Sequence, residues 1–209
     1  MDITGHNITN VNTAGYSRQV AMQQASAPLG VPSGAGMVGT GSDVVGISRI
    51  RDDFLDFKFW SENDDYGEWE TKFTMMSELE AIFDEPSDNG MNKVFDDFYF
   101  SLQELAKDPS NESVRALVKQ NGVAVARYFN SIASSLNRVR SDCNNALKIK
   151  VDEVNSYARQ IRDLNEQIYK SELNGNVAND LRDQRTELVN KLSKIIDVEA
   201  TEIVVNKQG

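Results

Sequence analysis

The sequence is poor in the side chains on which most metal and redox sites depend. It contains one cysteine, Cys143, and one histidine, His6. A single cysteine cannot close an intramolecular disulfide, and these two residues are too few for a multi-histidine or structural zinc site. Cys143 also falls on an apolar helical stripe, which is typical of a structural thiol. We therefore expect no metal and no cofactor.

Long hydrophobic runs and an excess of basic residues are also lacking. No stretch approaches the roughly 18 apolar residues of a transmembrane helix, and Met1 to Gly5 lack the basic and apolar regions of a cleavable signal peptide. The chain has 22 basic and 32 acidic residues, a net charge of −10. Because phosphate backbones and anionic lipids attract basic surfaces, we expect no nucleic-acid partner and no membrane partner.

Glycine and proline are concentrated at the start of the chain. Residues 1–50 hold eight of the 13 glycines and two of the four prolines, so short strands and turns should dominate there. Strands are predicted over residues 19–24 and 43–50, with a Gly/Pro-rich connection between them. Residues 34–39 match the spacing of a dinucleotide-binding loop. The glycines that follow are incompatible with the helix such a loop requires, and an ordinary loop is favoured.

Apolar residues recur at helical spacing after residue 50. A helix is predicted from about Asp52, with an acid-rich first turn that suits its N-terminal dipole. Residues 84–90 end this helix. They match part of a calcium-binding loop, but Pro86 and two weak ligands favour a helix-to-helix turn. A shorter helix follows, and Ser110 or Asn111 should cap the N-terminus of the next one.

The longest predicted helix runs from Val114 to about Leu173 and contains no proline. Roughly 60 residues at a rise of 1.5 Å give a length of about 90 Å. Asn174 to Asn176 stop this helix, and a returning helix over 181–195 completes an antiparallel hairpin. The core is expected to include most of an aromatic group, part of which could instead cover a partner subunit. Its members are Trp60, Trp69, Phe73, Phe95, Phe98, Tyr128 and Phe129.

These patterns predict a mainly α fold. It is an elongated antiparallel helical bundle with a very long helix and a small β or extended portion near the N-terminus. Three segments are expected: a connector (1–50), a rod-like helical domain (51–199) and the first strand of a following domain (200–209), whose β-rich residues are 200–205.

An Asn-rich stretch, residues 7–19, matches no common catalytic or metal-binding pattern. Asparagine and threonine side chains compete with the backbone for hydrogen bonds, and Gly15 permits a positive φ. We expect this stretch to avoid helix and to form a connector of fixed shape.

The stretch from Asn7 to Tyr16, Asn-Ile-Thr-Asn-Val-Asn-Thr-Ala-Gly-Tyr, resembles the signature that axial flagellar proteins carry just after their first helix. That family comprises rod, hook and hook-associated proteins. Its customary proline is Ala14 here. Residues 39–55, 163–168 and 179–185 are similar to segments of the hook-associated members at the hook–filament junction.

The resemblance implies a structural, non-enzymatic adaptor at that junction, which self-associates in a ring. Implied partners are the hook protein, the next hook-associated protein and an export chaperone. The implied location is extracellular, after flagellar type III export without a cleavable signal. Candidate connector and subunit-interface residues are Asn7, Asn10, Asn12, Thr13, Gly15, Tyr16 and Arg18. The alternatives are a hook or distal rod protein, a non-flagellar helical binding module, or an enzyme.

Family members have a helix before the Asn-rich signature and a matching helix at their C-terminus. Neither is recognised in this sequence, so we expect a fragment. Because those flanking helices drive polymerisation in the family, this chain alone should be monomeric. Light scattering in solution would measure this, and a ring of defined mass would contradict it.

Overall fold

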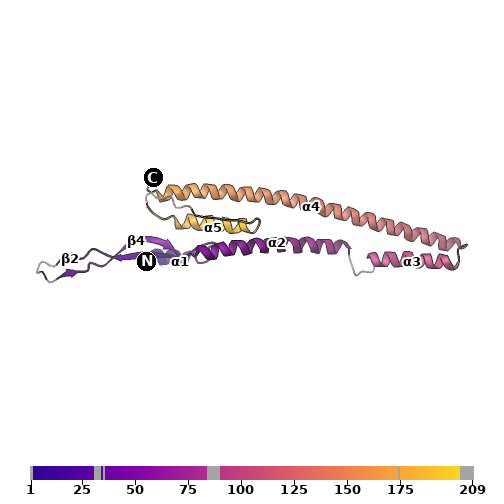
Figure 1. The fold of residues 1–209 in the computed structure, drawn as a ribbon, viewed down its shortest axis with the longest axis horizontal. Helices are drawn as coiled ribbons and strands as arrows, with labels where there is room; N and C mark the ends of the chain where they lie inside the picture. The colour runs from indigo at the N-terminus through magenta and orange to yellow at the C-terminus, as the bar shows by residue number, and fades with distance from the viewer. Residues whose placement is uncertain (1, 31–33, 35, 84–89, 174, 203–209) are drawn as a thin grey trace. The chain divides into compact units, whose positions relative to one another are not determined.

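The computed structural model describes residues 2–30, 34, 36–83, 90–173 and 175–202, and the described chain is mainly helical (Figure 1). This confirms the predicted fold class. The helices are α1 (Asp2–Thr9), α2 (Asp53–Phe83), α3 (Met91–Lys107), α4 (Glu112–Glu172) and α5 (Asn179–Ser193). The strands are β1 (Gln19–Ala25), β2 (Leu29–Gly30), β3 (Met37–Val38) and β4 (Ser42–Arg49).

The chain divides into two compact units. The first comprises Met1–Gly67 and Asp152–Gly209, and the second comprises Glu68–Val151. Helices α2 and α4 contribute residues to both. The predicted division into a connector, a helical domain and a following strand stays a prediction.

Strands β1 and β4 form an antiparallel ribbon in the first unit. Their register pairs Gln19 with Arg49 and Ala25 with Ser42, and it shifts between Met22 and Gln23. Both predicted strands are therefore correct to within one residue at each end. Beyond the ribbon, β2 pairs with β3. Since β3 is a strand, the segment after Gly36 lacks the helix of a dinucleotide-binding loop.

Helix α1 corrects two expectations. We expected no helix before the Asn-rich stretch and none within it, yet α1 covers Asp2 to Thr9. The threonine and asparagine side chains that were expected to compete with the backbone instead bind carbonyls at the end of α1. The hydroxyl of Thr9 donates to the carbonyl of Gly5 at 3.0 Å, and the amide of Asn10 donates to the carbonyl of His6 at 3.0 Å. These bonds satisfy carbonyls of the last helical turn, so the helix persists three residues into the stretch.

Within the first unit, the start of α2 lies very close to α5. The indole Nε1 of Trp60 donates to Oδ1 of Asn190 at 2.7 Å. The side-chain amide of Asn63 donates to the backbone carbonyl of Asn190 at 2.9 Å. A Cβ placed on Gly67 would lie 2.0 Å from the carbonyl oxygen of Lys194. Only glycine fits this contact, which places α2 directly against the chain at the end of α5.

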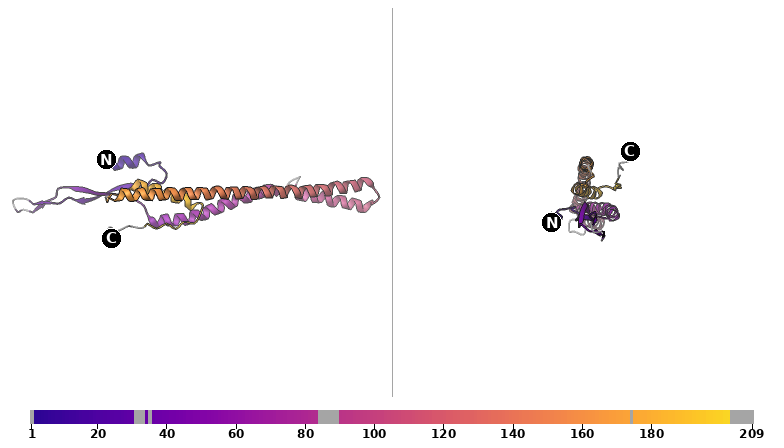
Figure 2. Two further views of the ribbon diagram at one scale, coloured as in Figure 1. Left: turned by 90° about the horizontal axis from the view of Figure 1, so that it is seen from above. Right: turned by 90° about the vertical axis from the view of Figure 1, so that its left-hand side faces the viewer.

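The second unit contains a hairpin of α3 and the first part of α4, which lie side by side in both side views (Figures 1 and 2). The amide of Asn121 donates to the carbonyl of Asp97 at 2.9 Å. The rings of Phe95 and Phe129 meet edge to face with centroids 6.0 Å apart. Asn111 caps α4 as predicted, since its Oδ1 accepts from the backbone N–H of Ser113 at 3.0 Å.

The expected aromatic core is wrong for part of the group. Trp69, Phe73 and Phe129 are exposed, whereas Trp60 is partly covered. Cys143 is half-buried. Helix α2 carries apolar residues on more than one face, and a helix can bury only the face that packs on its own chain. Fully buried apolar side chains are accordingly few in the described residues.

Two predictions fall partly or wholly on residues that the structure does not describe. The calcium-loop alternative rests on residues 84–89, which lie outside the described residues. The β-rich end is not a strand from Ala200 to Glu202, and its remaining residues lie outside the described residues as well.

Adding a methyl group at Gly67 should destabilise the protein. Gly67→Ala forces the added Cβ against a backbone carbonyl, and overpacking of this kind costs about 1–3 kcal/mol of unfolding free energy. Urea unfolding followed by circular dichroism measures this cost.

Gly122→Ala is the matched control. Its Cβ would meet only a ring atom of Phe98, at an ordinary 3.5 Å. Since alanine favours helix over glycine, we expect a gain of about 0.5–1 kcal/mol. Equal effects of the two changes would contradict the packing at Gly67.

Candidate functional site

Residues 7–19, called the connector from here on, link α1 to β1. Asn7 holds the two ends of this connector together. Its Nδ2 donates to the carbonyl of Gln19 at 2.9 Å, and its Oδ1 accepts from the backbone N–H of Gln19 at 2.9 Å. The hydroxyl of Tyr16 donates to the same Oδ1 at 2.7 Å. The side chain thus pairs with Gln19 as a neighbouring strand would, and it fixes the distance between α1 and β1.

The turn between these ends is shaped by Asn10, Thr13 and Gly15. The hydroxyl of Thr13 donates to Oδ1 of Asn10 at 3.2 Å, and the backbone N–H of Thr13 donates to the carbonyl of Asn10 at 2.9 Å. Gly15 has a φ of 75°, and a Cβ there would lie 2.8 Å from Cβ of Glu187 on α5. Glycine is therefore required both by the backbone conformation and by the close approach to α5.

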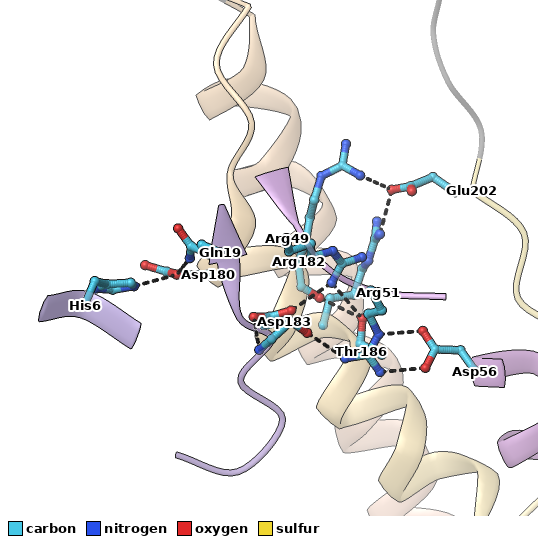
Figure 3. Close-up of polar contacts among 12 residues, drawn as sticks. His6, Gln19, Arg49, Arg51, Asp56, Asp180, Arg182, Asp183, Thr186 and Glu202 are labelled. Atoms are coloured by element: carbon cyan, nitrogen blue, oxygen red, sulfur yellow. Dashed lines mark hydrogen bonds and ion pairs between the residues drawn. The ribbon is translucent and has the colours of Figure 1, made fainter. Parts of the chain in front are cut away.

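Asp183 on α5 anchors the connector to the helices, as Figure 3 shows. Its side chain is buried, with 4% of the residue exposed. One carboxylate oxygen accepts from the backbone N–H of Ser17 at 2.7 Å, and the other accepts from Arg49 of β4 at 2.9 Å. A single buried carboxylate thus joins the connector, the ribbon and α5.

Arg51 continues this network to the start of α2. Its guanidinium binds both carboxylate oxygens of Asp56, at 2.5 and 2.8 Å, and donates to the hydroxyl of Ser17 at 3.0 Å. Bidentate pairs of this type fix orientation as well as distance. The first turn of α2 is therefore held to the same point as the connector.

Asp180, one turn before Asp183, binds the other side of the connector. Its carboxylate accepts from Nε2 of Gln19 at 2.6 Å and lies 3.3 Å from Nε2 of His6. The ring of His6 meets that of Tyr16 edge to face. Burial raises the pKa of Tyr16, and the negative charges of Asp180 and Asp183 raise it further. The phenol is therefore a stable hydrogen-bond donor at neutral pH.

A second charged cluster fixes the turn between α4 and α5. Arg182 binds both oxygens of Glu172, at 2.7 and 2.8 Å, and Glu172 also accepts from the backbone N–H of Ala178. Glu202 pairs with Arg182 and Arg185. The hydrogen bond from Arg182 lowers the pKa of Glu172. Burial raises the pKa of Glu202, but its arginine partners outweigh burial and the net shift is downward.

The structure brings together five of the seven predicted connector residues: Asn7, Asn10, Thr13, Gly15 and Tyr16. Asn12 and Arg18 are exposed, and in the described part of the chain their side chains have no hydrogen-bond or ion-pair partner. The roles of all seven in assembly stay a prediction.

Sequence reasoning missed the anchoring residues Arg49, Asp180 and Asp183. The last two lie in the 179–185 segment, so the signal was present as two carboxylates at i and i+3 on one helix. Nothing in the sequence indicated that this helix returns to the connector.

An apolar groove of about 1140 Å³ lies beside the connector, between α1 and the ribbon. Its lining includes Ile3, Ile8 and Val11 from one side and Val20 and Val44 from the other.

Within the described residues, no cluster of three or more His, Cys, Asp or Glu side chains could hold a metal ion. No described helix is long and apolar enough to cross a membrane.

Removing the Asn7 amide should loosen the connector. Asn7→Ala leaves the N–H and carbonyl of Gln19 without their partner, which we expect to cost about 1–3 kcal/mol of unfolding free energy. Asn12→Ala is the matched control and should change stability by less than about 0.5 kcal/mol. Chemical denaturation of both variants measures the difference, and equal stabilities would contradict the role of Asn7.

The Glu172–Arg182 pair should make stability depend on acid pH. Because the folded pKa of Glu172 lies below its unfolded value, its contribution is fully present above the unfolded pKa and is lost as pH falls through the folded pKa. Glu172→Gln should therefore flatten the loss of unfolding free energy below about pH 4.3. Exposed Glu112→Gln is the control, and an unchanged acid slope in Glu172→Gln would refute the expectation.

Comparison with known proteins identifies the family. Residues 76–208 match the family described as the flagellar hook-associated protein FlgK helical domain. The chain is 37% identical over 214 residues to flagellar hook-associated protein 1 of Bacillus subtilis, covering 100% of this chain and 42% of that protein.

Two enterobacterial proteins of the same name are also similar. Flagellar hook-associated protein 1 of Escherichia coli is 30% identical over 206 residues, and that of Salmonella typhimurium is 29% identical over 204. Each alignment covers 96% of this chain and 37% or 36% of the relative, respectively. The chain thus spans about two fifths of the length of these relatives, and it belongs to the flagellar hook-associated protein FlgK family.

Proposed function

We propose that this chain is part of a structural adaptor at the hook–filament junction of the bacterial flagellum, where it is needed for filament assembly. The observation that carries the proposal is the similarity to hook-associated protein 1 along the whole chain. The proposed mechanism is subunit packing, in which one interface repeated by rotation builds a ring.

The anchored connector supports this mechanism. An adaptor between two polymers must hold its parts at fixed distances, because a loose joint would not transmit the position of one polymer to the next. The paired amide of Asn7 and the buried carboxylate of Asp183 hold α1, the ribbon and α5 together. The site supplies rigidity and shape, and no catalytic step is assigned to it.

The proposed partners are other copies of the chain, the hook protein, the next hook-associated protein and a flagellar export chaperone. The groove between α1 and the ribbon offers one apolar surface for such contacts. The proposed location is the extracellular junction, reached by flagellar export without a cleavable signal peptide. The relatives' name, flagellar hook-associated protein 1, supports a place at the hook. The individual partners, the chaperone and the export route are part of the proposal.

Deleting residues 7–19 from the full-length protein tests the connector. We expect hooks of normal length that lack stable filaments, because α1 would lose its fixed link to the ribbon. Electron microscopy of cells measures the fraction of hooks with filaments. Full-length protein with the exposed change Glu112→Gln is the control and should assemble normally. Normal filaments on the deletion strain would refute the role of this connector.

Immunogold labelling tests the location. Label at the distal end of the hook supports the junction. Label along the hook or beneath it would favour a hook or distal rod protein, and label confined to the cytoplasm would favour a helical binding module outside the flagellum.

A further inference from the structure

The second unit exposes a line of large apolar side chains along α2. The members of this aromatic seam are Trp69, Phe73, Met76 and Phe83, whose spacings are four, three and seven residues. Their exposed fractions are 67%, 75%, 60% and 39%. Alternating steps of three and four residues form the contact line that one helix offers to another helix. The assigned site does not use this seam.

The adjacent face of α2 is already partly covered. Met75, Leu79 and Ile82 are half-buried, in contrast to the seam. The hydroxyl of Tyr128 on α4 donates to the carbonyl of Phe83 at 3.3 Å, which places the end of α2 against α4. The half-buried line accounts for the packing of α2 in its own chain, and the seam is a second apolar face. A continuous line of exposed large apolar side chains is typical of an interaction surface.

The same unit contains a groove along α4. It has a volume of about 710 Å³, lies between α4 and Val94 of α3, and is lined by small apolar side chains together with polar ones such as Gln120 and Ser131. Its lining includes Val94, Ala116, Val123 and Ala124. Small side chains leave room between the helices, and large side chains from another helix fill such room as knobs fill holes.

The helix segment that carries the seam and the segment of α4 that lines the groove have opposite net charges. Residues 68–83 of α2 contain four glutamates and one lysine. The groove is flanked by Lys119 and Arg127, both exposed and, among the described residues, without an ion-pair partner. From residue 112 to 151, α4 has seven basic and two acidic residues. Opposite charges around an apolar contact fix its register and exclude wrong partners.

We propose that the aromatic seam of one copy of this chain binds the groove between α3 and α4 of a second copy. Seam and groove are different surfaces of one molecule, so the contact is heterologous and can repeat from copy to copy. The inference rests on the proposed ring at the junction and names the surfaces that meet there. An isolated chain can still be monomeric, because the rest of the assembly raises the effective concentration of the two surfaces.

Disulfide trapping between two copies tests the contact in assembled flagella. Cells would express two full-length forms with different tags, both carrying Cys143→Ser, one with Phe73→Cys and one with Val123→Cys. Mild oxidation should give a dimer that carries both tags. The control replaces Val123→Cys with Ala133→Cys, an exposed position of α4 outside the groove, and should give roughly tenfold less mixed dimer.

The outcomes separate this inference from the proposed function. Filaments with immunogold label at the junction but without mixed dimer, or with equal trapping at Ala133→Cys, overturn the contact and leave the proposed function intact. A disulfide to a protein of another mass overturns the choice of a second copy. Absence of the protein from the junction in wild-type cells overturns the proposed function itself.

Charge reversal gives an independent readout. Lys119→Glu with Arg127→Glu on the groove copy should reduce trapping roughly tenfold, because like charges then face each other. Glu80→Lys on the seam copy should restore trapping, because Glu80 lies four residues after Met76 and three before Phe83, on the same face of α2 as the seam. A change that merely damaged the fold of the groove copy would not be rescued by its partner, so failure of the rescue overturns the pairing.

Discussion

The buried carboxylate of Asp183 is the interaction on which the rest of the first unit depends. It accepts from the backbone of Ser17 and from the guanidinium of Arg49, and water is nearly excluded from it. Removing one partner of a buried charge pair costs about 3–5 kcal/mol, because the remaining charge is left without compensation. The direction in which the connector leaves the helices is therefore set by one side chain of α5.

Two glycines show how closely the surrounding parts must approach. Gly15 brings the connector against Glu187, and Gly67 brings α2 against the carbonyl of Lys194. Neither contact tolerates a Cβ at the observed geometry. The hydrogen bonds and ion pairs of Asn7 and Asp183, which we call the polar clamp, act together with the close backbone contacts. The hydrogen bonds define direction, and the glycines permit the distance at which those bonds can form.

The large exposed apolar surface of α2 differs from the connector in whether it gains stability from a partner. A helix that packs one face on its own chain and leaves a second apolar face in water is stabilised further when another helix covers it. The polar clamp keeps its geometry without a partner, because its donors and acceptors are satisfied internally. The internally satisfied connector and the exposed apolar face of α2 both support the proposed role of the chain as a subunit of an assembly.

The helices and strands were largely determined by local sequence. The proline-free run after Asn111, its Asn cap, and the stop at Gly175 produced the long helix almost as predicted, because periodicity and end signals act over a few residues. Strands β1 and β4 followed from local alternation in the same way. The first three residues of the Asn-rich stretch departed from the prediction because Thr9 and Asn10 bond to carbonyls of α1 rather than breaking it.

Only the tertiary structure decided what these elements touch. Asn7 and Gly15 were recognisable as connector residues, but their partners Gln19 and Glu187 depend on the return of the chain. The pairing of Asp183 with Ser17 joins residues 166 positions apart. The exposure of Trp69 and Phe73, which looked like core, was equally a tertiary outcome. The periodicity of apolar residues indicates that a helix has an apolar face. The position of the other helices determines whether its own chain covers that face.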